Sequence, residues 1–426
     1  MSAPVFRISP TVQQYDWGKP GASSKVAQLA RAAGIPNLSI DDNAPYAELW
    51  MGTHPKSPSR IPTLNDQTLQ HYLAAHPEFL GDDVIKKFDA GNGNLPFLLK
   101  ILAIQKALSI QSHPDKATAE KLYAEQPDIY KDPNHKPEMA VALTAFTGLC
   151  GFLPLPNIAK FLSFTPEFAA LIPSDIAKRF LSVVEKSPED PAVKIALRDV
   201  FSAVMTAPEA EFKSQLAALV KRYEVGGEHA EERIVKPLVL TLQSQFPGDI
   251  GIFCAFLLNY IELKPGEAIF LGAGEPHAYI SGDIVECMAN SDNVIRAGLT
   301  PKLRDVPNLT STLTYIPAPS TKHYVQPAPF SRASSGQYTI LYDPPIPEFS
   351  VLQTKLPKGK REQHKAIKGP SIAVVTAGKG VVTWGGDAKG ELEIAEGNVF
   401  FIAAGADVEL TAKGVTLVLY RAFVDA

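Results

Sequence analysis

The chain has 426 residues, of which 45% are hydrophobic and 20% charged, with a formal net charge of -4 and a pI near 6.2. This length suggests two or three domains. The slightly acidic balance argues against a nucleic-acid binder or a protein of anionic membranes, because both need a basic surface. The longest apolar run, residues 251–261, is shorter than the ~20 residues that span a bilayer, and no signal-peptide pattern opens the sequence. We therefore expect a globular protein without a membrane partner.

The three cysteines, Cys150, Cys254 and Cys287, lie far apart in apolar sequence and form no CxxC pair. This usage favours buried thiols in a reducing compartment over a disulfide framework or a thiolate zinc site, so we expect a cytoplasmic protein. The 36 prolines and 29 glycines indicate many turns, as in a β-rich protein with long connections.

In the first hundred residues, a helix is predicted near 23–33, followed by a half-buried strand over 46–51. The alternation in that strand makes Glu48 a candidate site acid, although a solvent-facing glutamate would give the same pattern. The run 95–104 is almost entirely apolar, and Lys100 interrupts it. A lysine in a buried strand is costly unless its ammonium reaches water or an anion, so Lys100 either extends to the strand edge or binds an anion.

The stretch that follows has two different faces. Read as a strand, it places Leu108 and Ile110 on one side and Ser109, Gln111 and His113 on the other. A single histidine is most often structural. The hydroxyl, amide and imidazole therefore predict a site only if other segments bring further ligands to the same place.

After a predicted helix at 116–125, the sequence Asn-His-Lys-Pro-Glu supplies two bases, His135 and Lys136, and an acid, Glu138. Pro137 restricts the preceding lysine to extended backbone. The carboxylate stands at the entrance of an apolar strand, so it is a plausible partner for the amide and imidazole of the earlier stretch.

Residues 153–251 have a different pattern. Their apolar residues show helical spacing at 176–184, 192–204 and 209–223, and proline-containing breaks separate these segments. No part of this block combines His, Asp and Glu at ligand spacing. We therefore predict a helical domain without chemistry of its own.

Strand signals resume at residue 261, and a Gly/Pro-rich bend after 268–271 delivers His277, with Tyr279 on the same strand face. Further charged residues follow within twenty positions: Glu286, Asp292 and Arg296. This order of turn, buried strand and bend is typical of a jelly-roll metal site.

The last part of the chain begins with a Pro/Ser-rich connection at 316–335, read as a linker or long loop, and then becomes β-like. Residues 266–277 repeat as 397–408, and Val408 stands where the first copy has His277. If both copies are jelly rolls, the second has lost this ligand and serves packing or interaction.

The candidate metal ligands are Gln111, His113, Glu138 and His277. Two imidazoles, one carboxylate and an amide oxygen suit Zn²⁺ with room for water or substrate. With one carboxylate the site keeps a formal charge of +1, which can stabilise a developing oxyanion. A scaffold without metal is the alternative.

At these residues the chain resembles the type I phosphomannose isomerase family, which are zinc enzymes of the cupin fold. The motifs that carry the resemblance are residues 14–19, 46–55, 106–116, 134–139 and 274–279, followed by Arg296 and Lys302. The resemblance implies that the four candidates are the ligands of one zinc ion per chain. One departure is Leu153, where the family pattern leads us to expect arginine.

The resemblance also implies a mainly β fold with three domains. These are a cupin-type jelly-roll catalytic domain (1–152 plus 253–318), an inserted all-α domain (153–252) and a second C-terminal jelly roll without metal (319–426). The implied reaction interconverts mannose 6-phosphate and fructose 6-phosphate through a cis-enediol, feeding GDP-mannose and glycan synthesis or glycolysis. We expect a monomer whose partner is a small sugar phosphate.

Roles follow from what this reaction requires. Arg296 cannot readily act as a base, so we expect it to stabilise the enediolate or guide the proton, oriented by Asp292 or Glu286. Lys136 is a candidate proton carrier, and His135 is the alternative. Ser109 and Lys100 are assigned to the phosphate. The remaining substrate-site candidates are Trp17, Glu48, Tyr279, Glu286 and Lys302.

Two other functions remain open on the sequence. His113, Glu138 and His277 alone form the two-histidine, one-carboxylate set of iron oxygenases, but Gln111 and the lysine and arginine cluster disfavour that reading. A non-catalytic sugar-phosphate binder would be expected to lack a ligand, as the second copy does.

Overall fold

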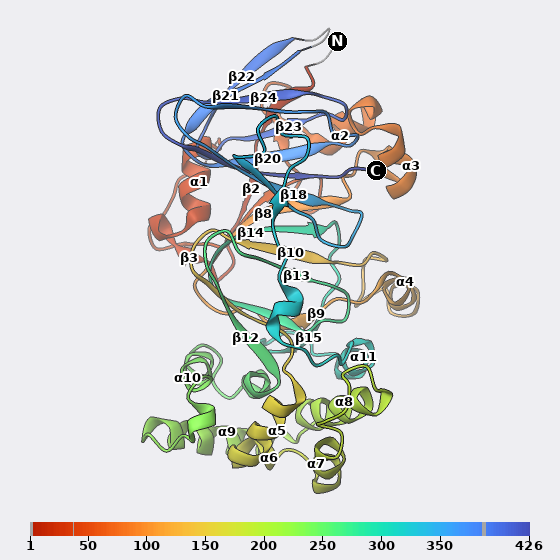
Figure 1. The fold of residues 1–426 in the computed structure, drawn as a ribbon, viewed down its shortest axis with the longest axis vertical. Helices are drawn as coiled ribbons and strands as arrows, with labels where there is room; N and C mark the ends of the chain where they lie inside the picture. The colour runs from red at the N-terminus through yellow and green to blue at the C-terminus, as the bar shows by residue number, and fades with distance from the viewer. Residues whose placement is uncertain (1–2, 37, 386–388) are drawn as a thin grey trace.

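The computed structural model describes residues 3–36, 38–385 and 389–426. Figure 1 shows three tiers along the long axis: the C-terminal sheets, a ten-stranded sheet in the middle, and a group of helices at the far end. The described strands form five sheets, and the helices α5 to α10 are inserted between the neighbouring strands β11 and β12. No helix among the described residues is both long and apolar enough to cross a membrane.

The ten-stranded sheet is organised around its longest strand, β14 (His277–Ala289). The first residues of β14 pair with β9 and β11, and the later ones pair with β8 and β10. The strand changes partners near Gly282, whose φ of 114° and close approach to the carbonyl of Ala145 leave no room for a side chain. The other strands are β2 (Thr11–Gln13), β5 (Glu48–Met51), β8 (Phe97–Ile104), β9 (Ile110–Ser112), β10 (Glu138–Ala142), β11 (Phe146–Phe152), β12 (Leu258–Leu263), β13 (Ala268–Leu271) and β15 (Ile295–Gly298).

Short elements complete this tier. The helix predicted near 23–33 is α1, and it is capped by Ser24, whose side-chain oxygen accepts a hydrogen bond from the backbone N–H of Ala27. The helices are α1 (Lys25–Ala33), α2 (Leu69–Ala75), α3 (Asp82–Phe88), α4 (Lys116–Glu125) and α11 (Val306–Thr312). Two two-stranded ribbons pair β3 (Lys19–Pro20) with β4 (Pro45–Tyr46) and β6 (Arg60–Ile61) with β7 (Gln67–Thr68).

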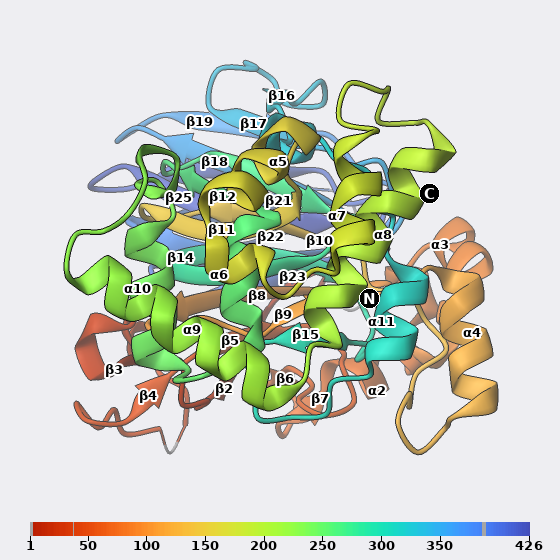
Figure 2. The ribbon, with the colours of Figure 1, turned by 90° about the horizontal axis from the view of Figure 1, so that it is seen from below.

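The inserted helices leave the sheet at the end of β11 and return at β12, its antiparallel neighbour. Seen from below in Figure 2, they cross in front of the sheets. They are α5 (Leu155–Phe164), α6 (Pro166–Ala169), α7 (Ser174–Leu181), α8 (Pro191–Met205), α9 (Glu209–Glu224) and α10 (Lys236–Gln245). The three predicted helices correspond to α7, α8 and α9. The first begins and ends earlier than predicted, because it starts directly after Pro173.

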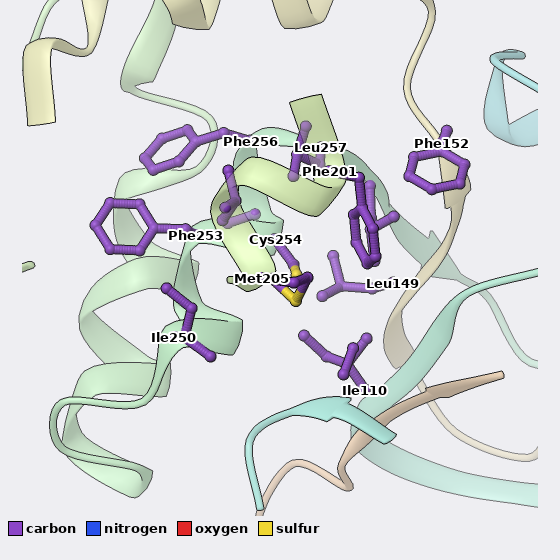
Figure 3. Packing of buried hydrophobic residues seen from close by; sticks show 14 of the residues in the cluster. Ile110, Leu149, Phe152, Phe201, Met205, Ile250, Phe253, Cys254, Phe256 and Leu257 are labelled. Carbon is purple, nitrogen blue, oxygen red and sulfur yellow. The ribbon is translucent and has the colours of Figure 1, made fainter. Parts of the chain in front are cut away.

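One hydrophobic core joins these helices to the sheet. Figure 3 shows Ile110 of β9 and Leu149 of β11 among the same side chains as Met205 and Cys254 from the helical segment. Full burial of an aliphatic side chain stabilises the fold by roughly 1.5–3 kcal/mol, so this contact holds β9 firmly in place. Leu153, the residue that departs from the family pattern, also packs against this core.

The C-terminal sandwich consists of a seven-stranded and a four-stranded sheet whose inner faces share a hydrophobic cluster. Its strands are β16 (Ala328–Pro329), β17 (Thr339–Tyr342), β18 (Ser350–Leu356), β19 (Arg361–His364), β20 (Ser371–Ala377), β21 (Lys379–Trp384), β22 (Gly390–Ala395), β23 (Val399–Ile402), β24 (Val408–Ala412) and β25 (Leu417–Phe423). The seven-stranded sheet also includes β1 (Val5–Ile8), which pairs with β23 although the sequence assigns these residues to the first domain.

The connection at 316–335 is irregular, as predicted, apart from a turn of 3-10 helix at Ser320–His323 and the short β16. It is not a free linker. Pro317 bridges to Phe152, Tyr324 bridges to Ile269, and His323 is buried. The three cysteines are buried and free, as expected.

Candidate metal centre and adjoining cavity

Three predicted site residues meet through strand register. Gln111 of β9 pairs with His277 of β14 on one side and with Arg296 of β15 on the other. Directly opposite residues of antiparallel strands project from the same face of the sheet. The amide, the imidazole and the guanidinium therefore stand side by side, although they are far apart in the sequence.

The metal cluster itself consists of His113, Glu138 and His277, which are all buried and offer ligand atoms within 4.8 Å of one another. The Nε2 atoms of both histidines lie 3.3 Å from carboxylate oxygens of Glu138. Neither Nε2 makes a hydrogen bond with any of the described residues. Buried polar atoms normally have partners, so this arrangement fits nitrogen atoms that bind a metal ion.

The opposite nitrogen of each ring fixes its orientation. Nδ1 of His113 lies 2.6 Å from the carbonyl oxygen of Asn293, and Nδ1 of His277 lies 2.9 Å from that of Glu275. Because a carbonyl can only accept, each Nδ1 carries the proton and donates it. Each Nε2 therefore presents a lone pair to the cluster, which is the tautomer that metal binding requires.

Electrostatics favour the same protonation state. Burial lowers the pKa of His113 to about 4, so its ring is neutral at pH 7. Burial alone would raise the pKa of Glu138, but the ammonium of Lys136, 3.0 Å away, and His113 outweigh burial and hold that pKa well below its usual value. Two imidazoles and one carboxylate suit Zn²⁺.

The fourth predicted ligand, Gln111, stands beside this cluster through its pairing with His277. Its place in the ligand set stays a prediction. Tyr279 also reaches the cluster, and its hydroxyl donates to a Glu138 oxygen at 3.4 Å.

A cavity of about 300 Å³ gathers four other predicted residues. Trp17 comes from the loop after β2, Ser109 from the segment before β9, Arg296 from β15, and Lys302 from the loop that follows it. A second cavity of about 350 Å³ shares Arg296 and Lys302 with the first. Arg296 is half-buried and forms no ion pair within the described part of the chain. Its charge is therefore available to a ligand.

Lys100 lies deeper in the sheet, and its ammonium is paired. Its Nζ is 3.1 Å from Glu286 and 3.5 Å from Glu48, and it lies 5.0 Å from the centre of the Trp50 ring. The indole N–H of Trp50 donates to Glu48. Burial opposes the charge on Lys100, but Glu286 and Glu48 raise its pKa above the usual value. The carboxylates of Glu48 and Glu286 thus neutralise the charge of this buried lysine.

The predicted orientation of Arg296 by Asp292 or Glu286 is not observed. Asp292 lies 2.9 Å from Nζ of Lys56 and 3.5 Å from Nε2 of His54, whereas Glu286 pairs with Lys100. Burial raises the pKa of Asp292, but His54 and Lys56 more than reverse this effect. The loop places the Asp292 carboxylate beside these bases.

Sequence reasoning missed three contributors to the site. His54 and Lys56 stand within or next to a motif that carries the family resemblance, but they have no ligand spacing. Asn293 acts through its backbone carbonyl, which no side-chain pattern can reveal. His135 was predicted as an alternative proton carrier, and its Nε2 lies 2.5 Å from Glu348 in the C-terminal part of the chain.

Three family models match the chain. They describe the phosphomannose isomerase type I catalytic domain at residues 5–155, the helical insertion domain at 171–258 and the C-terminal region at 339–387. Together they cover more than half of the sequence. This chain belongs to the type I phosphomannose isomerase family. The metal cluster and the inserted helices described above are therefore features of a member of that family.

Full-length relatives support the membership in this isomerase family. The mannose-6-phosphate isomerase of Cryptococcus neoformans is 49% identical over 445 residues, and that of Saccharomyces cerevisiae is 46% identical over 433 residues, each covering 100% of both chains. A solved Salmonella typhimurium mannose 6-phosphate isomerase, bound to fructose 6-phosphate and zinc, is 27% identical with a TM-score of 0.78. A zinc-bound mannose 6-phosphate isomerase has the same TM-score at 28% identity, and both structures match 100% of each chain.

Proposed function

We propose that this type I phosphomannose isomerase interconverts mannose 6-phosphate and fructose 6-phosphate with one zinc ion held by Gln111, His113, Glu138 and His277. The observation that carries the proposal is the pair of buried, unpartnered Nε2 atoms on either side of Glu138. The zinc-bound family structures support the choice of metal. When bound, zinc would supply an electrophile that polarises the substrate's oxygens.

The reaction moves one proton between two carbon atoms. A base removes the proton from C2 of the aldose while the carbonyl oxygen at C1 gains one, which gives a cis-enediol. The hydroxyl proton at C2 then leaves and C1 receives a proton, so no atom or electron is gained overall. We assign the carbon-to-carbon transfer to Lys136, because its Nζ lies 3.0 Å from Glu138 of the metal cluster, whereas Nε2 of its alternative, His135, lies beside Glu348 outside that cluster.

Arg296 is assigned to the charge that develops during this transfer. Its guanidinium stays protonated and lines the cavity without a carboxylate partner in the described chain, so it can stabilise the enediolate oxygen. Its neighbour in register, Gln111, places it directly beside the metal ligands. We propose no orienting carboxylate for it, because Asp292 and Glu286 are paired elsewhere.

The phosphate is assigned to Ser109 and Lys302, which line the same cavity as Trp17. Holding this remote group would orient the reacting end of the sugar. The sequence also suggests Lys100 for the phosphate, but its ammonium is already neutralised by Glu48 and Glu286. We propose instead that Lys100, Glu48 and Glu286 form a buried charged cluster that, with Tyr279, supports Glu138.

The finer fold assignment is also a proposal. The strand order and the repeated strand-turn-strand unit support two jelly rolls of the cupin type, with the domain limits expected from the sequence and with β1 added to the second roll. We propose that the protein acts as a cytoplasmic monomer on a small sugar phosphate.

Metal analysis combined with an assay for fructose 6-phosphate formation tests the function. We expect one zinc per chain and turnover that disappears on chelation and returns with zinc. Iron in the purified protein together with oxygen consumption would overturn the isomerase assignment in favour of an oxygenase. Zinc without turnover would instead favour a sugar-phosphate binder.

A further inference from the structure

The segment that carries Lys136 and Glu138 is irregular before β10 begins, so other parts of the chain must hold it in place. On one side it is tied to the loop after β14. The amide of Asn293 donates to the carbonyl oxygens of Asp132 and Asn134, and the hydroxyl of Ser291 donates to Asn134 as well. These bonds fix the start of the segment but do not contact the side chain of His135.

The side chain of His135 is held by a residue that is distant in the sequence. Its Nε2 lies 2.5 Å from Oε1 of Glu348, which is 213 residues further along the chain. Glu348 belongs to the connection between β17 and β18 of the C-terminal sandwich and is buried. A carboxylate oxygen accepts, so the His135 ring donates the hydrogen bond.

The surroundings make this contact rigid. The residue after Glu348, Phe349, is fully buried in the hydrophobic cluster that also contains Met139, the residue after the metal ligand Glu138. The two segments are therefore joined by one hydrogen bond, and the residue that follows each of them is buried in the same hydrophobic cluster. Movement of the 348 connection would be transmitted directly to residues 135–138.

We propose that Glu348 is a positioning residue for the isomerase reaction, acting through His135 on the segment that carries Lys136 and Glu138. This inference rests on the proposed function. It gives the C-terminal sandwich a part in catalysis, although none of the described residues of that sandwich belongs to the metal cluster. Glu348 does not line either cavity beside Arg296, so we do not assign it contact with substrate.

A positioning role predicts a larger effect on turnover than on binding. Displacing catalytic groups by about 1 Å can lower the rate about 100-fold, and removal of a partner of a metal ligand costs about 10- to 100-fold. For Glu348→Ala we expect kcat to fall about tenfold, with KM within about twofold and zinc content unchanged. Glu348→Gln keeps an oxygen that accepts from His135 and should recover most of the lost kcat.

A double-mutant cycle separates action through His135 from a general loss of stability. If Glu348 acts through that ring, His135→Ala/Glu348→Ala should lose no more kcat than the more impaired single variant. The matched control is Tyr342→Phe, which removes another hydrogen bond between the C-terminal sandwich and the middle tier, from the tyrosine hydroxyl to the carbonyl oxygen of Gly266 at 2.6 Å. It should lower Tm without lowering kcat.

Hydrogen exchange provides a readout that does not depend on turnover. In Glu348→Ala, amides of residues 134–140 should exchange faster than in the wild type, while those of β24 should not change. Unchanged exchange at 134–140, an unchanged kcat, or additive losses in the double variant would each overturn the positioning role. A wild-type protein with zinc but without isomerase activity would refute the proposed function instead, and the exchange experiment would still decide whether Glu348 orders this segment.

Discussion

The two copies of the internal repeat have equivalent secondary structure, but their last residues, His277 and Val408, lie in different environments. His277 is the first residue of β14 and Val408 is the first residue of β24, and both follow a buried four-residue strand and a turn. His277 faces Glu138 and His113, whereas Val408 packs in the apolar interior of the C-terminal sandwich. One strand-turn-strand unit therefore supports a metal ligand in one place and a hydrophobic core in the other.

The surroundings of Val408 also include polar side chains. His364 lies directly opposite Val408, and Glu362 is two residues away on the same strand. These groups are hydrogen-bonded to neighbours within the sandwich: the hydroxyl of Thr339 contacts both, and Ser335 donates to the carboxylate. A metal centre thus needs more than a histidine in a suitable strand. Three distant segments must deliver ligand atoms without satisfying them locally.

The largest expected effect comes from removing the residue that distinguishes the two copies. His277→Ala should abolish zinc retention and isomerase activity together, because it deletes one of the two imidazole ligands. Metal content after gel filtration and initial rates measure both. Val408→Ala is the matched control and should keep a full zinc content. Full zinc in His277→Ala would remove this residue from the ligand set.

The second-largest effect is expected from replacing Arg296, the arginine beside the metal cluster. Arg296→Ala should lower kcat about 100- to 1000-fold, as expected when a donor to a developing oxyanion is lost, while zinc content stays unchanged. Steady-state kinetics on both sugar phosphates provide the measurement. Arg421→Met, which removes a buried guanidinium from the C-terminal sandwich, should leave kcat unchanged. An effect of Arg296→Ala confined to KM would move this residue to the phosphate anchor.

The metal-free protein should be sensitive to acid through His113. Its folded pKa of about 4 is depressed from the usual 6.5, so the unfolded chain binds the proton more readily. The stability contribution is complete above pH 6.5 and is lost as pH falls toward 4, by about 3 kcal/mol at most. Urea titrations across this range should show a smaller pH dependence for His113→Gln. Parallel curves for the two proteins would contradict the assignment.

The smallest effect is expected from restoring the missing imidazole. Val408→His should destabilise the protein by about 1–3 kcal/mol, because it places a polar ring in an apolar cluster. It should bind no second zinc, since Glu362 and His364 are engaged by hydroxyl groups. Thermal unfolding and zinc stoichiometry test this variant. Two zinc ions per chain would show that the second site lacks only its histidine.

Much of the first site could be predicted because its residues stand in short segments with strong patterns. Alternation placed Gln111 and His113 on one face, and the proline-restricted segment put Glu138 at the start of a strand, as the structure shows at β10. The repeat paired His277 with Val408, and in the structure these residues begin β14 and β24. The helical insertion was clear from spacing, although the start of α7 depended on Pro173.

The partners of these residues could not be predicted in the same way. Asp292 was expected near Arg296 because the two are close in sequence, but loop geometry gives its carboxylate to Lys56. The pairing of His135 with Glu348 spans most of the chain and has no local signal. Alternation and spacing report which face a residue occupies, whereas the choice of partner depends on how separate segments pack.

The pairing of β1 with β23 has a consequence for how the protein is made. Residues 5–8 leave the ribosome long before their hydrogen-bonding partners, residues 399–402. At 5–20 residues per second, the early strand waits roughly 20–80 s for its partner to be synthesised. During that interval a nascent chain carries an unpaired strand edge, which is prone to association with other chains. Slowing translation of the last hundred codons should therefore increase the demand for chaperones that bind the N-terminal segment.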